Sequence, residues 1–257
     1  MQDSKDYKDR KKALRKWLTV YGRNPVETCL QDTALVPKVL HLADSNQDST
    51  KLDRLITHAQ ARGCEIRMHT RDALARISKN KKQDQGVALD IECKLYDDLD
   101  SFLASNSAAE SSLILLDRVT NPQNLGMIIR SATAANINGI IIPERGCAPL
   151  GPLVAKASAG TLFHAPILRC ESTLAGLKAL GQAGYTSYVL SSHAHTSVFD
   201  HEYPRKRAVI LGNESDGVSK EVEVQASSAL CIPMSNKVES LNVAVTAALI
   251  AYHLNQI

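Results

Sequence analysis

The stretch Val209-Ile210-Leu211-Gly212-Asn213-Glu214-Ser215-Asp216-Gly217 begins as an apolar strand and stops abruptly at glycine and polar residues. A second stretch of the same kind follows, Cys231-Ile232-Pro233-Met234-Ser235-Asn236-Lys237-Val238-Glu239-Ser240-Leu241-Asn242-Val243. In open α/β sheets, ligands bind at the carboxyl ends of strands, where loops expose backbone groups that the sheet does not use. The two strand ends therefore predict opposite walls of one small-molecule pocket.

Apolar segments of strand length alternate with helical patterns from residue 112 onward. The expected strands are residues 113–119, 139–143, 165–168, 186–191, 208–211 and 229–232. The expected helices are residues 125–135, 150–158, 174–183, 219–225 and 241–254. Repeated strand-then-helix order predicts an α/β domain whose parallel sheet is covered on both faces.

The N-terminal part of the chain has a different organisation, which predicts four regions in total. They are a charged arm at residues 1–18, a small α/β domain at 19–93, a linker at 94–111 and the large domain at 112–257. In the small domain we expect helices at residues 25–31 and 51–61 and strands at 38–42, 64–69 and 87–91. The linker is acidic and serine-rich, which is typical of a connecting segment with a short helix.

Composition excludes several classes of protein. No apolar stretch approaches the length of a membrane span, and the N-terminus lacks the features of a signal or transit peptide. The six cysteines are scattered without a C-x-x-C pair, which predicts reduced thiols, a cytoplasmic location and no zinc. His193, His195 and His201 lack a cysteine or carboxylate at ligand spacing, so we expect no metal.

Basic residues concentrate in the N-terminal third of a chain whose net charge is only +3. One cluster comprises Lys8, Arg10, Lys11, Lys12, Arg15, Lys16 and Arg23, and the other comprises Lys79, Lys81 and Lys82. Either cluster alone fits a solvated helical face or a mobile tail. Together they favour an RNA-facing region that neutralises phosphates.

A third polar cluster follows the first strand of the large domain and reads Leu115-Leu116-Asp117-Arg118-Val119-Thr120-Asn121-Pro122-Gln123-Asn124-Leu125-Gly126-Met127-Ile128-Ile129-Arg130. On one regular helix, Asn124 and Arg130 would project about 120° apart. They converge only if Asn124 lies in the loop or at the N-cap. The alternative interpretation is a helix cap followed by a surface arginine.

Three motifs occur in order: N-x-G-x-x-x-R at residues 124–130, L-G-N-E-x-x-G at 211–217, and I-P-M…V-x-S-L-N-V at 232–243. This series resembles the SpoU (TrmH-like) family of RNA ribose 2′-O-methyltransferases, within the SPOUT superfamily, over roughly residues 112–256. Residues 21–26 and 85–88 are similar to the substrate-binding domain of the 23S rRNA guanosine methylases of that family. Those members often carry a histidine at the position of Asp84.

The resemblance implies a fold, a cofactor and partners. The large domain would contain a trefoil knot, the small domain would be L30e-like and bind RNA, and the protein would act as a homodimer. S-adenosylmethionine would be the methyl donor, without a metal. The implied donor-binding residues are Leu211, Gly212, Ile232 and Leu241, and the implied catalytic residues are Asn124, Arg130, Glu214 and Asn242.

The implied reaction is methyl transfer to a ribose 2′-hydroxyl in structured RNA, with a guanosine of 23S rRNA favoured. Two alternatives remain: transfer RNA as the substrate, or an RNA-binding assembly factor that has kept the fold without turnover. The set of Asn124, Arg130, Glu214 and Asn242 favours the enzyme, because a factor that only binds RNA has no need of all four residues.

Arg130 has two possible roles in such a reaction. As a general base it would have to be neutral, and neutralising a guanidinium at pH 7 costs roughly 9 kcal/mol at about 1.36 kcal/mol per pH unit. As a clamp it would hold a phosphate or a developing oxyanion with its planar fork. The second role is favoured, and the first stays open.

Overall fold

Six consecutive buried residues form β6 (Ser111–Leu116), the central strand of a parallel sheet. Its last four residues, Leu113 to Leu116, are apolar, and such a run is typical of a parallel strand that is covered on both faces. The structure is a computed structural model that describes residues 17–47, 49–92, 96–213 and 216–256. Within these residues the sheet has seven strands in the order β11-β9-β10-β6-β7-β8-β5, all parallel. The other strands are β5 (Asp97–Asp98), β7 (Gly139–Pro143), β8 (Ile167–Cys170), β9 (Thr186–Leu190), β10 (Lys206–Leu211) and β11 (Ser228–Leu230).

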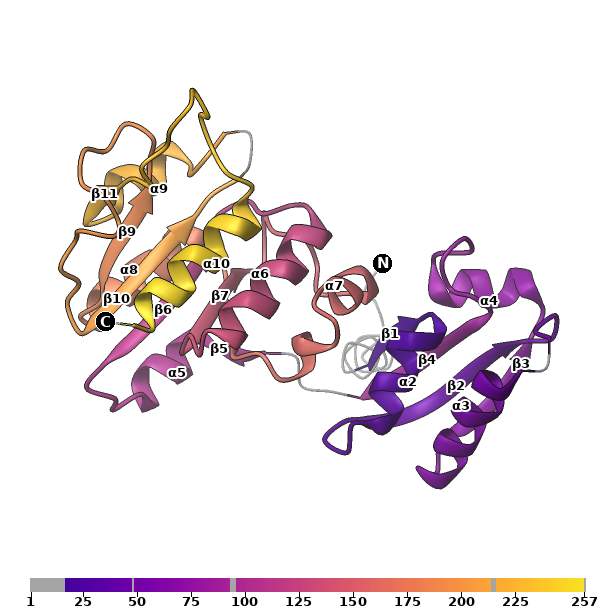
Figure 1. The fold of residues 1–257 in the computed structure, drawn as a ribbon. Helices are drawn as coiled ribbons and strands as arrows, with labels where there is room; N and C mark the ends of the chain where they lie inside the picture. The colour runs from indigo at the N-terminus through magenta and orange to yellow at the C-terminus, as the bar shows by residue number, and fades with distance from the viewer. Residues whose placement is uncertain (1–16, 48, 93–95, 214–215, 257) are drawn as a thin grey trace, which may run out of the picture. The chain divides into compact units, whose positions relative to one another are not determined.

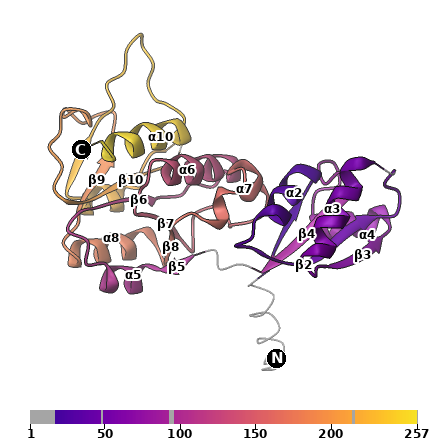
Figure 2. The same cartoon turned by 60° about the horizontal axis from the view of Figure 1, so that its bottom comes forward.

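Helices cover both faces of this sheet. They are α5 (Leu99–Ser105), α6 (Pro122–Ala134), α8 (Thr173–Gln182), α9 (Lys220–Gln225) and α10 (Val243–Leu254). Side chains of α5, α8 and α9 form one apolar core with β6 and its neighbouring strands, and Leu177, Leu180 and Val222 belong to it. Helices α6 and α10 lie side by side on the opposite face (Figures 1 and 2).

The order of the strands reverses at β6. From β6 the chain continues to β7 and β8 on one side, whereas β10 and β9 lie on the other side. In open α/β sheets the crevice at such a reversal, outside the carboxyl ends of the strands, is where ligands bind. The carboxyl ends of β6 and β10 therefore mark the expected site.

The chain folds into two compact units, one of residues 1–94 with 151–163 and the other of residues 95–150 with 164–257. The first unit contains β1 (Trp17–Tyr21), α2 (Arg23–Gln31), β2 (Val36–Ala43), α3 (Thr50–Ala61), β3 (Glu65–His69), α4 (Arg71–Ser78), β4 (Val87–Glu92), α7 (Pro152–Ala157) and the 3-10 helix η1 (Thr161–Phe163). Its sheet has the order β1-β4-β2-β3, in which β2 and β3 are parallel and the other pairs antiparallel. Helix α4 packs on the sheet through Leu74 and Ile77.

The predicted fold class is confirmed: a small α/β domain precedes an α/β domain with a parallel sheet. The sequence analysis missed β1 and α4. Trp17 and Leu18, assigned to the charged arm, begin β1, whose sequence Trp-Leu-Thr-Val-Tyr is rich in the aromatic and β-branched residues that favour strands. Helix α4 is short and charged; it begins at a Thr70 cap and ends at Lys79, which has a left-handed backbone.

Two further expectations concern topology and membranes. The trefoil knot stays a prediction of the family resemblance. Within the part of the chain that the structure describes, no helix combines the length and apolar character needed to cross a bilayer.

Candidate active site

The carboxyl end of β10 leads into a loop that folds back on itself. Leu211, the last residue of β10, is buried and pairs with Leu116 of β6. Asn213 donates its backbone N–H to the carbonyl of Gly217 (2.9 Å), and Gly217 donates back to Asn213 (3.0 Å). The Asn213 side chain also donates to the Arg118 carbonyl (3.0 Å). The loop after β10 is therefore attached to the segment that follows β6.

Gly212 lies at the base of this loop and is half-buried. A Cβ at this position would lie 2.2 Å from the carbonyl carbon of Gly217 and 2.3 Å from the nitrogen of Val218. These atoms are backbone and cannot turn away as a side chain would. The glycine is needed because the two limbs of the loop touch, whatever ligand lies beside them.

The site's central contact joins two of the predicted catalytic residues. Asn242 donates its Nδ2 to Oδ1 of Asn124 over 3.3 Å. Asn242 is also the N-cap of α10 and accepts the N–H of Ala244 (2.9 Å). Asn124 is buried, whereas Asn242 is exposed. One amide thus fixes the start of α10 beside the first turn of α6.

The condition for convergence is not met, because Asn124 lies within α6 and neither in the loop nor at the N-cap. Asn121 is the N-cap of α6, and its side chain accepts from the backbone of Gln123 (2.8 Å) and Asn124 (3.4 Å). Pro122 occupies the first turn, where its fixed φ favours the helix and no N–H is needed. The helix therefore starts early enough to include Asn124.

As a consequence, Asn124 and Arg130 do not converge within one chain. Both lie on α6, six residues apart, so their side chains project about 120° from each other. Asn124 is buried against Asn242, whereas Arg130 is exposed. The structure brings together Asn124 and Asn242 and leaves Arg130 on the solvent side of α6.

The second wall of the predicted pocket follows β11. The backbone N–H of Cys231 donates to the Thr196 carbonyl, and the Cys231 carbonyl accepts from the backbone N–H of Val198, both over 2.9 Å. Ile232 and Leu241 are half-buried at the two ends of an exposed loop, residues 233–240 (Figure 1). They combine apolar surface with nearby exposed backbone, which suits the adenosine part of a nucleoside ligand. Glu214, the remaining predicted catalytic residue, lies outside the described residues.

The chemistry of the described side chains near these strand ends disfavours thiol catalysis. Burial raises the pKa of Cys147, and it raises the pKa of Cys170 to about 11. Both thiols therefore stay protonated near neutral pH and are poor nucleophiles. No group of three or more potential metal ligands occurs among the described residues.

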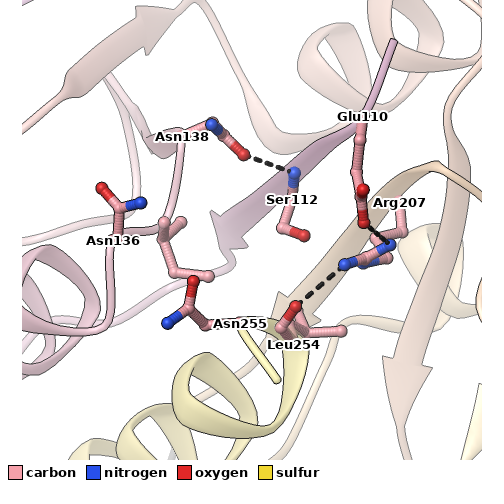
Figure 3. A pocket seen from close by; sticks show the side chains of 8 residues that line it. Glu110, Ser112, Asn136, Asn138, Arg207, Leu254 and Asn255 are labelled. Atoms are coloured by element: carbon pink, nitrogen blue, oxygen red, sulfur yellow. Dashed lines mark hydrogen bonds and ion pairs between the residues drawn. The ribbon is translucent and has the colours of Figure 1, made fainter. Parts of the chain in front are cut away.

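A polar pocket of about 320 Å³ occupies the opposite, amino-terminal edge of the sheet (Figure 3). Arg207 donates to the carbonyl of Leu254 (2.8 Å) and pairs with Glu110 (3.0 Å) there. These contacts give a carbonyl in the last turn of α10 a donor and give the buried guanidinium a carboxylate partner.

Sequence reasoning passed over Asp117, which is 3% exposed at the end of β6. The signal was present, because a carboxylate directly after a fully apolar strand needs partners in the folded protein. Its partners include Thr173 of α8 and Ser219, which follows the loop that begins at Gly212.

Comparisons with known proteins agree with this geometry. Residues 111–252 match the SpoU rRNA Methylase family, and residues 19–96 match the family described as RNA 2′-O ribose methyltransferase substrate binding. An uncharacterized tRNA/rRNA methyltransferase of Mycobacterium leprae is 32% identical over 234 residues, which cover 90% of this chain and 75% of that protein.

Solved structures share the fold across nearly the whole chain. The SpoU methyltransferase AviRb from Streptomyces viridochromogenes, in complex with the cofactor AdoMet, has a TM-score of 0.75 at 24% identity and covers 99% of this chain and 93% of its own. An AdoMet-bound rRNA methyltransferase from Sinorhizobium meliloti has a TM-score of 0.73 at 21% identity, with coverages of 98% and 90%. Since a family match spans more than half of the chain and carries the motifs of both strand ends, the protein belongs to the SpoU family and is an S-adenosylmethionine-dependent RNA methyltransferase.

Proposed function

We propose that the protein methylates a ribose 2′-hydroxyl in structured ribosomal RNA, with a guanosine of 23S rRNA as the favoured target and transfer RNA as the runner-up. The observation that carries the proposal is the hydrogen bond between Asn242 and Asn124, which joins the first and third motifs at the strand-order reversal. The match of residues 19–96 to a 2′-O ribose methyltransferase substrate-binding family supports the ribose as the acceptor.

Leu211, Gly212, Ile232 and Leu241 form the proposed donor site. S-adenosylmethionine, when bound, supplies a methyl group on a sulfonium that reacts with an oxygen aligned opposite the sulfur. Leu211 and the two half-buried apolar residues provide a slot for the adenosine, and the loops beside them expose backbone donors and acceptors. This combination of apolar walls and a few polar groups suits such a ligand.

Asn124, Arg130, Glu214 and Asn242 form the proposed catalytic set. The side-chain amide of Asn242 donates one N–H to Asn124 and has a second N–H. Because Asn242 is an exposed residue, this second N–H donates to a ribose oxygen in the proposed complex. Arg130 acts as a clamp that holds the phosphate beside the target and stabilises the oxyanion as the 2′-hydroxyl loses its proton. Alignment of that oxygen with the methyl group supplies a large part of the acceleration.

We assign substrate choice to the small domain, residues 19–93. Lys79, Lys81 and Lys82 are exposed in the loop between α4 and β4. Fully buried Asp84 anchors this loop by accepting from Ser78 Oγ (2.7 Å). Lys81 pairs with Asp72 (2.6 Å), and a loop that presents Lys79 and Lys82 beside this pair suits the phosphates of a folded RNA. The other basic cluster lies outside the described residues, apart from Arg23.

A second copy of the chain completes the enzyme in this proposal. Val245, Leu249 and Tyr252 are 49%, 39% and 49% exposed on one side of α10, with the spacing of a helical stripe. Met127 on the neighbouring α6 is 41% exposed, three residues before Arg130 on the same face. A twofold partner that covers this stripe would also enclose Arg130, which the single chain leaves in solvent.

If the exposed stripe on α10 is a dimer interface, a charged residue in it should lower the molecular mass of the protein in solution from that of a dimer to that of a monomer. Leu249→Asp is expected to turn a dimer into a monomer and to lower methyl transfer, because a carboxylate would be buried without a partner. Sedimentation velocity at micromolar protein measures the mass. Val224→Asp is the matched control: Val224 is 84% exposed on α9, far from the stripe, and the variant should keep the dimer. A wild-type monomer, or a dimeric Leu249→Asp, would contradict the proposal.

The reaction itself is tested by product analysis. The purified protein is incubated with S-adenosylmethionine and either 23S rRNA or tRNA transcripts, and the RNA is digested to nucleosides for mass spectrometry. The expected product is 2′-O-methylguanosine from rRNA, absent with Asn124→Ala. Methylated bases in place of methylated ribose would refute the proposed position, and activity on tRNA alone would transfer the assignment to the runner-up.

The same assay checks the role of the small domain. A chain in which Lys79, Lys81 and Lys82 are all glutamate should bind S-adenosylmethionine normally but transfer methyl groups to RNA about tenfold more slowly at subsaturating RNA. An unchanged rate of methyl transfer would show that this loop does not determine the choice of substrate.

A further inference from the structure

Asp117 is a buried carboxylate with no role in the proposed chemistry. It follows β6 directly and is 3% exposed. A buried charge is costly unless hydrogen bonds satisfy it, so its partners show what the residue does.

Both carboxylate oxygens have partners. Oδ1 accepts from the hydroxyl of Thr173 (2.9 Å) at the start of α8. Oδ2 accepts from the backbone N–H of Ser219 (2.7 Å) at the N-cap of α9 and from Nε of Arg118 (3.4 Å). The backbone N–H of Asp117 donates to the carbonyl of Leu211 (2.8 Å), at the end of β10. One residue thus holds both ends of the loop of residues 212–218.

Arg118 extends this attachment to the interior of the loop. Its φ of +57° is in the left-handed region, which turns the chain sharply after Asp117. Its carbonyl accepts from the Asn213 side chain (3.0 Å), and its guanidinium donates to the carbonyl of Gly217 (3.3 Å). The loop is therefore fastened at its two ends and at both residues of its internal bridge.

We infer that Asp117 is a positioning residue for the methyl donor: it holds the loop of Gly212 in the shape that binds S-adenosylmethionine. This inference rests on the proposed donor site. Asp117 would act on donor binding by holding the loop in place, without touching S-adenosylmethionine itself.

Two substitutions of similar size separate the role from general stability. Asp117→Leu removes all three hydrogen bonds that the carboxylate accepts and should weaken S-adenosylmethionine binding by about tenfold to one-hundredfold. Asp117→Asn should remain within about threefold of wild type. In this variant the amide oxygen takes the place of Oδ2 and accepts from the Ser219 N–H, and the amide N–H donates to the Thr173 hydroxyl, which can also accept.

The matched control lies at the other end of the same strand. Asn138 accepts the backbone N–H of Ser112 through Oδ1 (2.8 Å; Figure 3). Asn138→Leu removes a comparable bond from the amino-terminal end of β6 and should leave donor affinity unchanged. Calorimetry with S-adenosylmethionine gives the affinity, and hydrogen exchange of residues 212–219, followed by mass spectrometry, reports the loop.

The expected result is faster exchange in residues 212–219 and weaker binding in Asp117→Leu, with rescue in Asp117→Asn. If Asp117→Leu does not fold, Thr173→Val removes one of the two side-chain partners and should give about threefold weaker binding with the same local exchange. Wild-type affinity in either folded variant, or equal weakening in Asn138→Leu, overturns the inference.

Failure of the inference is distinguishable from failure of the donor site. If Gly212→Ala weakens binding and Asp117→Leu does not, only the role of Asp117 is refuted. If neither variant changes the affinity, the donor site itself is misplaced.

Discussion

Arg130→Lys is expected to lower single-turnover methyl transfer by about 100-fold to 1,000-fold at every pH between 6 and 10. Lysine keeps the positive charge but loses the planar fork that binds two oxygens at once. Arg130 is exposed on α6 and belongs to the solvent face, so the substitution leaves the core intact. Rates are measured at saturating S-adenosylmethionine and RNA, where binding of either no longer limits the rate.

The pH profile separates a clamp from a base. A lysine ammonium loses its proton roughly three pH units below a guanidinium. If Arg130 were the general base, Arg130→Lys would regain activity steeply as the pH rises toward 10, with wild-type donor affinity throughout. A flat, low profile supports the clamp. Steep recovery in the variant alone would overturn the clamp and leave the methyltransferase assignment standing.

Gly212→Ala is expected to weaken S-adenosylmethionine binding by about 100-fold, the cost of an ångström-scale misplacement in a site. The added Cβ would lie 2.2 Å from a backbone carbon of Gly217, whereas ordinary contact begins at 3.4 Å, so one limb must move by about 1.2 Å. The effect needs no direct clash with the ligand. Isothermal calorimetry on the folded variant measures it.

Gly181→Ala provides the control for this substitution. Gly181 lies in α8, and a Cβ there would meet nothing within 4 Å. Its donor affinity should equal that of the wild type, and alanine suits a helix better than glycine. Equal affinity in Gly212→Ala as well would place the donor elsewhere in the protein.

The sequence by itself determined the class of fold and the candidate residues. The last four residues of each run that ends at Leu116 or Leu211 are apolar, which is the local pattern of strands buried in a parallel sheet. The polar residues directly after them mark the site, because loops at strand ends are free of the sheet's own hydrogen bonds. Residues 17–21 also have the aromatic and β-branched composition of a strand, although they follow directly on a highly charged segment.

Only the tertiary structure decided which candidates meet. Asn124 and Asn242 are 118 residues apart, and their contact depends on how α6 and α10 pack on one face of the sheet. The cap at Asn121 sets the start of α6 before Asn124, so Arg130 projects about 120° around the helix from Asn124. A spacing of six residues fixes the angle between two side chains only once the helix boundaries are known.

The reason for Gly212 also came from the fold. The sequence shows only a glycine at a strand end, which is compatible with a close approach of either a ligand or another part of the chain. The folded chain places the returning limb of the loop, at Gly217 and Val218, against the same position. Asp117 is a similar case, since its partners at Thr173 and Ser219 are 56 and 102 residues away. Local pattern specifies what each segment forms, whereas long-range packing decides which segments share a contact.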